Sequence, residues 1–285
     1  MRPWLAGTIA VWLCGLGVPL CAVQSGGPAD AAGFVAQATA AAARYGDPAA
    51  AAADGYRPVG PDFPSMGQHW ISAGLLVSGA LDVTRPPILE YAELQGRLTL
   101  VGVAYAALTL DGKAPPAFPV PTGVWHFHAG TLETESFVSS HAGAGHEGRG
   151  PRVAVLHVWV GLANPDGVFS AENWALPYAR FGYAVPPSAL PGVARALALA
   201  AGSGYVDALL QVVGRPDSGE AAALREVVHR SRAGVLAILA PVQRRPVLDA
   251  ADEARLAQSW NELWDSLRRT ASPAVWARLE PYIGR

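Results

Sequence analysis

Hydrophobic and polar positions divide the chain into segments with three different patterns. Residues 26–56 are rich in alanine, and Asp30 and Asp47 each precede an apolar stretch, as a helix-capping residue does. Residues 57–185 carry short apolar runs separated by proline and glycine, which is typical of strands and turns. Residues 186–285 show only helical spacing. We predict an α+β fold: a mainly antiparallel β-sheet or barrel domain between Ala-rich N-terminal helices and an all-helical C-terminal region.

Three runs in the central segment have the features of strands. Ile88 to Leu94 alternates, and Gln95-Gly96 is a hairpin signal before a second run from Leu98 to Ala107. Arg152 to Val160 is a continuous apolar run apart from His157. This last run predicts a strand that is buried on both faces of the sheet.

Caps and helix breakers divide the C-terminal region into helices. Ser188 is predicted to cap the first helix and Asp217 to open the longest, which Pro241 stops. The fourth helix is amphipathic, and we expect the Trp260 and Trp264 side of it to pack against the β domain. The predicted helices span residues 189–200, 204–213, 217–239, 249–269 and a last short stretch from Pro273.

Residues 1–25 have the pattern of a signal peptide. Arg2 supplies the positive charge, an apolar run extends from Trp4 to Leu20, and cleavage is expected near Ala22 to Ser25. The run is short and broken by glycine and proline, which favours a cleaved signal over a membrane anchor. Lipidation of Cys21 is a further alternative, although Leu20 is large for such a cleavage site. We predict an exported protein, periplasmic or extracellular.

The composition excludes several classes of function. Both cysteines, Cys14 and Cys21, precede the expected cleavage site, so the mature chain would have no disulfide, thiol nucleophile or Cys-ligated metal. The net charge of -2 and the lack of a basic stripe give no indication of nucleic acid. No glycine-rich loop carries the lysine of a phosphate cradle, so no nucleotide cofactor is indicated.

The histidines carry the main functional signal. Six of the seven fall between His69 and His157. On an extended strand, positions i and i+2 share a face, so His126 and His128 would present two imidazoles side by side to a metal ion. His157 lies in the buried strand, where it is either a metal ligand or a core histidine bonded to backbone or a carboxylate.

Carboxylates near these histidines are the other candidate ligands. Glu90 shares a strand face with Ile88, and if that face is buried Glu90 needs a charged partner, a metal or a proton. It would then be a ligand, or an acceptor that orients a ligating histidine; the alternative is a solvated edge strand. Glu133 follows the histidine pair. His141 and His146 lie in a glycine-rich loop, as a lid, a capture site or solvated side chains.

The segment His126-x-His128, followed after four residues by Glu133, resembles the first metal motif of the cupins, small β-barrels that hold a metal with two His, a Glu and a later His. The resemblance implies His157 as the later ligand. The second cupin motif has Pro-x-Gly before its histidine, and here Ala154-Val-Leu156 stands in that place.

A longer stretch is similar to an uncharacterised family of exported bacterial proteins. The similarity implies a site made of His69, a carboxylate at position 104 and His157, but this chain has Ala104. We therefore expect the histidine pair to supply substitute ligands. The shared segments are Ala53-Asp-Gly-Tyr56, Met66-Gly-Gln-His-Trp70, Pro87-Ile-Leu-Glu-Tyr91, Leu100-Val-Gly-Val-Ala-Tyr105, Leu156-His-Val-Trp159 and Asn164-Pro-Asp-Gly-Val-Phe169.

Three hypotheses of function follow. The first is binding of a divalent transition metal, Zn²⁺ or Cu²⁺, which suit imidazole ligands. The second is a cupin-like metalloenzyme with an open coordination position beside Trp70, Trp125 and Trp159. The third is a module without metal, whose helical tail docks a protein partner or the membrane surface. The predicted metal-site residues are His69, His126, His128, His157, Glu90 and Glu133.

Overall fold

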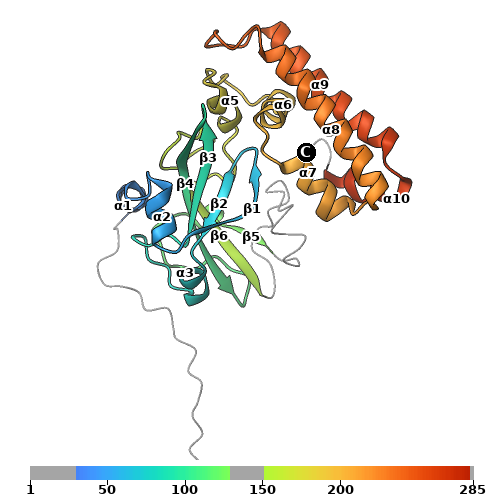
Figure 1. Ribbon diagram of the computed structural model, residues 1–285. Coiled ribbons are helices and arrows are strands. Elements are labelled where there is room, and N and C mark those ends of the chain that lie inside the picture. Colours follow the sequence, from blue (N-terminus) through green and yellow to red (C-terminus); the bar gives the residue numbers. More distant parts are fainter. Residues whose placement is uncertain (1–29, 129–150, 283–285) are drawn as a thin grey trace, which may run out of the picture.

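The computed structural model describes residues 30–128 and 151–282 (Figure 1). The expected signal peptide, Glu133, His141 and His146 lie outside these residues. The described chain has an α+β fold, with a curled antiparallel sheet and an all-helical C-terminal region, which confirms the predicted fold class. No described helix is both long and apolar enough to cross a membrane.

Two short helices precede the sheet, as the alanine-rich pattern predicts. They are α1 (Ala31–Ala43) and α2 (Pro48–Ala53). The Asp30 side chain accepts a hydrogen bond from the Gly33 backbone N–H at 2.7 Å, and Asp47 accepts one from Ala49 at 2.9 Å. Both aspartates therefore satisfy N–H groups that the first helical turn leaves unpaired.

Six antiparallel strands form one sheet in the order β1-β2-β3-β4-β6-β5. The hairpin between β3 and β4 turns at Gln95 and Gly96, both with positive φ (51° and 79°), as the hairpin signal predicts. The strands are β1 (Arg57–Phe63), β2 (Gly67–Ile71), β3 (Ile88–Leu94), β4 (Arg97–Thr109), β5 (His126–His128) and β6 (Arg152–Val158). Short helices α3 (Ala73–Ser78) and η1 (Thr122–Val124) lie in the connections.

The two faces of the sheet have different environments. One face packs against α1 in a large apolar core, where Phe34 lies 5.6 Å from Tyr105 and 4.5 Å from Phe118 between ring centroids. On the other face, Ile88, Ala104, Ala106 and Val155 form a much smaller apolar cluster. This second face also carries the histidines described below.

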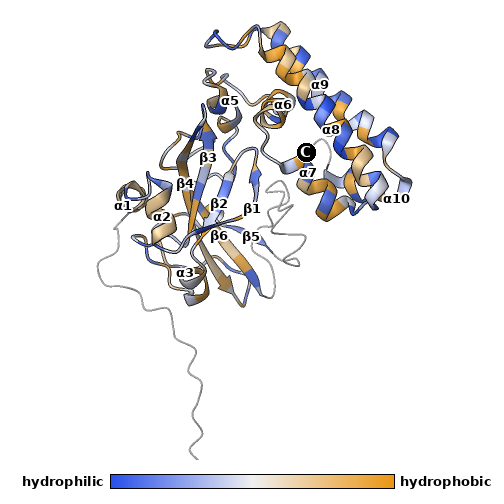
Figure 2. Cartoon of the chain, viewed as in Figure 1, coloured by the Kyte–Doolittle hydropathy of each residue, from blue (hydrophilic) through white to orange (hydrophobic). Residues whose placement is uncertain are grey.

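The C-terminal helices build a core of their own. Figure 2 shows apolar residues interrupted by polar ones along α8 and α9, and the buried apolar residues of both helices belong to one cluster. Trp260 and Trp264 lie in this helical core, so the expectation that they pack against the β domain is wrong. The elements are α5 (Leu176–Phe181), α6 (Pro191–Ala201), α7 (Tyr205–Leu209), η3 (Leu210–Gly214), α8 (Ser218–Leu239), α9 (Ala250–Thr270), α10 (Pro273–Leu279) and η4 (Glu280–Tyr282).

Two boundaries differ from the predicted ones. Helix α6 starts at Pro191, and its N-cap residue is Leu190 instead of the expected Ser188. The start lies at Pro191 because the fixed φ of proline suits the first helical position. Helix α5 lies within residues 57–185, predicted as the β domain, yet its Tyr178 joins the helical core. The Asp217 side chain accepts a backbone N–H at 2.9 Å at the start of α8, as expected, and Asp249 does the same at the start of α9.

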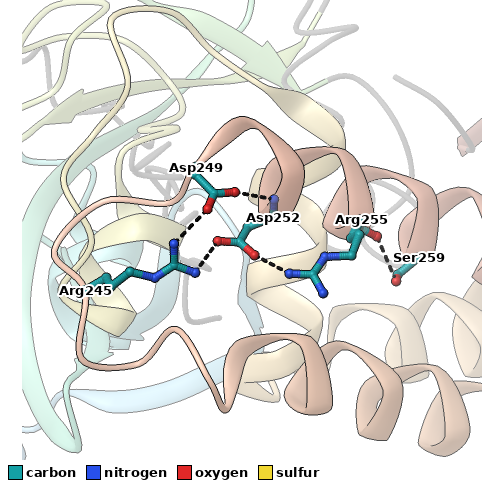
Figure 3. A network of polar contacts seen from close by, with 5 residues as sticks. All are labelled: Arg245, Asp249, Asp252, Arg255 and Ser259. Atoms are coloured by element: carbon teal, nitrogen blue, oxygen red, sulfur yellow. Dashed lines mark hydrogen bonds and ion pairs between the residues drawn. The ribbon is translucent and has the colours of Figure 1, made fainter.

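Polar contacts fix the helical region to the sheet and to itself. Arg180 on α5 donates two hydrogen bonds to Asp62 on β1, at 2.8 and 2.5 Å, and its carbonyl accepts one from Gln95 in the β3–β4 turn. At the start of α9, Arg245 and Arg255 both bind the buried Asp252 (Figure 3). The first set joins the helical region to the sheet edge, and the second holds the loop before α9.

A candidate histidine–carboxylate site

Strand register places the candidate residues on one face of the sheet. His69 on β2 lies opposite Glu90 on β3, and His157 on β6 lies opposite Ala104 on β4. Residues directly opposite in an antiparallel pair point to the same face. His126 on β5 lies opposite Val155, two positions before His157, so it shares that face as well.

Glu90 lies at the centre of this arrangement and is fully buried. Its Oε1 atom is 3.6 Å from Nε2 of His69 and forms a closer ion pair with Nδ1 of His157. The alternative of a solvated edge strand is wrong, because β3 is an interior strand of the sheet. The carboxylate therefore has two imidazole partners close to it inside the sheet, as its burial requires.

Glycine at position 102 provides the space for this carboxylate. Gly102 lies opposite Glu90, and an ideal Cβ atom there would be only 2.1 Å from Oε2 of Glu90. Within the described residues, Oε2 accepts no hydrogen bond. A proton donor or cation close to this oxygen would therefore be favourable.

The four imidazoles form a continuous row. The ring centroids of His126 and His128 are 4.9 Å apart, those of His126 and His157 are 5.0 Å apart, and those of His157 and His69 are 6.2 Å apart. His126 and His157 are buried, and His128 is half-buried. The strand alternation from which we expected His126 and His128 to lie side by side is thus present.

Burial and mutual charge set the protonation of the site. Burial alone would raise the pKa of Glu90, but the charges and hydrogen bonds of His157 and His69 lower it to about 2. The pKa of His128 is lowered to about 4, first by burial and then by the charges of His157 and His69. At neutral pH, Glu90 is therefore ionised and His128 is a neutral imidazole, which is the form that binds metals.

Glu172 is a neighbour of the site that sequence reasoning missed. Surrounding protein raises the pKa of its carboxyl and the charges of Arg195 and His157 lower it, although the residue itself is exposed to solvent. Asn173, fully buried, holds this loop by accepting the Ala175 N–H and donating to the carbonyls of residues 162 and 163. A lone glutamate after a turn carries no sequence signal of its own.

The structure brings together five of the six predicted metal-site residues and does not describe the sixth, Glu133. Between His69 and His157, the carboxylate comes from Glu90, and position 104 holds a buried alanine. Of the three tryptophans expected beside an open coordination position, Trp159 lies near His157, with 6.5 Å between ring centroids. Trp70 and Trp125 pack in the apolar core of the other face.

Within residues 30–128 and 151–282, no three His, Cys, Asp or Glu side chains form a ready-made metal site. No protein-family model, curated protein or solved structure matches the chain. The resemblances to the cupins and to the exported bacterial family therefore stay predictions.

Proposed function

We propose that this protein, after export, binds a divalent transition metal ion through His126, His128 and His157, with His69 at the edge of the site. The ion would be Zn²⁺ or Cu²⁺, because a set of imidazoles without thiolates suits these metals. The proposal rests on the position of these four histidines on one face of the sheet. Their present ring orientations do not form a metal site among the described residues, so binding requires the imidazole rings to turn.

The spacing of the rings carries the proposal. Two imidazoles bound to one tetrahedral ion, at about 2.0–2.1 Å from nitrogen to metal, have ring centroids about 5 Å apart. The observed separations are 4.9 Å for His126–His128 and 5.0 Å for His126–His157. The strands therefore hold His126 at the spacing of two ligands to one ion from each of His128 and His157, and the proposal assigns the remaining adjustment to the side chains.

Glu90 has the role of an orienting acceptor in this proposal. It contacts Nδ1 of His157, so Nε2 is the nitrogen that would face the metal. A carboxylate bonded to the second nitrogen of a ligating histidine fixes the ring and makes it a stronger ligand. The negative charge of Glu90, buried with one oxygen that accepts no hydrogen bond from the described residues, also favours a nearby cation.

Metal content and titration test the proposal. The mature chain from residue 26 would be stripped of metal, titrated with ZnCl₂ and CuCl₂ by calorimetry, and assayed for bound metal after dialysis. We expect close to one ion per chain for the wild type and nearly none for the His126→Ala/His128→Ala double variant. His229→Ala is the matched control, because His229 is exposed on α8. Equal, substoichiometric metal in all three proteins would exclude the proposed site.

A further inference from the structure

The edge strand β1 ends beside the histidine site, and the sheet alone holds it weakly. Pro58, Gly60 and Pro61 interrupt the strand. Its pairing with β2 shifts register between Val59 and Asp62. Because proline donates no backbone hydrogen bond and glycine has no side chain to pack, such a strand needs support from outside the sheet.

The helical region supplies this support through three contacts with the end of β1. The buried guanidinium of Arg180 on α5 donates two hydrogen bonds to the Asp62 carboxylate, at 2.8 and 2.5 Å. The backbone of Asp62 forms a parallel bridge with Gly204, the residue before α7. The next residue of each segment makes the third contact, since the ring centroids of Phe63 and Tyr205 are 6.1 Å apart.

The Phe63 ring connects these contacts to the histidine site. Phe63 lies opposite Gly67 on β2, two positions before His69, so Phe63 and His69 share one face of the sheet. Their ring centroids are 5.9 Å apart with 47° between the ring planes, which is within the range of favourable aromatic pairs. Phe63 is buried and His69 is partly exposed. The imidazole therefore packs against a ring that is itself held in place.

The distance between His69 and Glu90 gives this packing a role. Nε2 of His69 is 3.6 Å from Oε1 of Glu90, which is longer than an ordinary hydrogen bond. At this distance the carboxylate attracts the imidazole without setting the plane of its ring. Packing of a neighbouring side chain is the other way in which a ligand rotamer is fixed, and Phe63 provides it.

We propose that Phe63 is a positioning residue for His69, and that the helical region holds Phe63 in that position through Arg180, Gly204 and Tyr205. The helical region is then a working part of the histidine site. The effect on metal affinity rests on the proposed function, in which His69 lies at the edge of the site. Loosening of the contacts at the end of β1 should therefore weaken metal binding, although none of these contacts involves a proposed metal ligand other than His69.

NMR of the metal-free mature protein tests the positioning without a metal. The imidazole C–H resonances of His69 would be identified by their loss in His69→Gln. We expect Asp62→Asn, which changes a residue with no contact to His69 of its own, to shift these resonances, as Phe63→Leu should. Phe34→Leu is the matched control and should leave them in place, because Phe34 is buried in the core on the other face of the sheet.

Unchanged His69 resonances in Asp62→Asn would overturn the proposal, and so would an equal shift in Phe34→Leu. Should Asp62→Asn fail to fold, Tyr205→Leu decides the question, because it removes the other contact between the helical region and Phe63.

A double-mutant cycle with zinc separates positioning from a general loss of structure. Phe63→Leu should weaken zinc binding about tenfold, the lower end of the loss seen when a partner that orients a ligand is removed. In a His69→Ala background the same substitution should have no further effect, because the residue through which Phe63 acts is missing. An equal loss in both backgrounds would show that Phe63 only supports the fold, and the proposal would be wrong.

Failure of the metal proposal gives a different result from failure of this one. If the wild type binds no zinc, the proposed function is wrong, and the NMR comparison of the metal-free variants alone decides whether Phe63 positions His69. If the wild type binds zinc and Phe63→Leu binds it equally well, the metal proposal stands and the positioning role is excluded.

Discussion

The Oε2 atom of Glu90 occupies the position where any residue other than glycine at 102 would carry its Cβ atom, with a separation of only 2.1 Å. These two residues lie opposite each other on β3 and β4, next to a shift in the pairing register between Glu90 and Tyr91. A buried carboxylate at the centre of the sheet thus depends on a neighbour without a side chain.

Substitution of Gly102 by alanine should therefore displace the Glu90 carboxylate from its histidine partners. We expect a loss of about 1–3 kcal/mol in the free energy of unfolding, the usual cost of overpacking a buried position. Urea unfolding of both proteins measures this difference. Gly234→Ala is the control: it lies in α8 with no atom near the added Cβ, and alanine there should stabilise the helix by about 0.5–1 kcal/mol. An unchanged stability in Gly102→Ala would contradict the close contact.

Substitution of Glu90 by glutamine should weaken both the fold and the proposed metal site. The amide keeps the shape but loses the charge that pairs with His157, and we expect a stability loss of about 1–3 kcal/mol. Metal affinity should fall about 10–100-fold, as it does when an orienting carboxylate is lost. Glu93→Gln on the same strand is exposed and should change stability by less than about 0.5 kcal/mol. Equal effects of the two substitutions would remove Glu90 from its assigned role.

Local signals explain which parts of the fold the sequence predicts. The helix starts predicted at Asp30, Asp47 and Asp217 depend on contacts between residues two or three positions apart, and all three caps are present. The β3–β4 hairpin likewise follows from its turn residues. In contrast, β1 contains two prolines and a glycine and carries no strand pattern, so it was not predicted.

The candidate site shows the same division between local and long-range information. The adjacent imidazoles of His126 and His128 follow from strand alternation alone. The contact of Glu90 with His157 requires β4 to lie between β3 and β6, and it also requires the glycine at 102. Glu172 comes near His157 through a loop held by Asn173, for which periodicity gives no signal.

Asp252 should stabilise the helical region more than its position in an exposed loop-to-helix junction suggests. It is buried, and it binds both Arg245 and Arg255 while its backbone N–H donates to Asp249 (Figure 3). Because both arginines are partly exposed and can be rehydrated, we expect Asp252→Ala to cost about 1–3 kcal/mol. Thermal unfolding measures the effect.

Asp265→Ala is the matched control for this experiment, because Asp265 is exposed on the same helix. It should change the free energy of unfolding by less than about 0.5 kcal/mol. If the two substitutions shift the unfolding temperature equally, the arginine network contributes nothing specific to stability.

Tyr91 should make the fold sensitive to alkaline pH. It is fully buried beneath the site, donates a hydrogen bond to the Tyr45 carbonyl at 2.6 Å, and has its pKa raised from 10.0 to about 12, mainly by burial. Between these two values the unfolded chain releases the phenol proton and the folded chain keeps it, so stability falls as pH rises. At neutral pH the free energy of unfolding of Tyr91→Phe should be lower by about 1 kcal/mol, because phenylalanine cannot donate this hydrogen bond. From pH 10 to 12 the free energy of unfolding of the variant should fall less steeply than that of the wild type. The difference between the two slopes should correspond to about one proton per chain. Urea unfolding across this range measures both curves, and parallel curves would show that Tyr91 ionises equally in the folded and unfolded states.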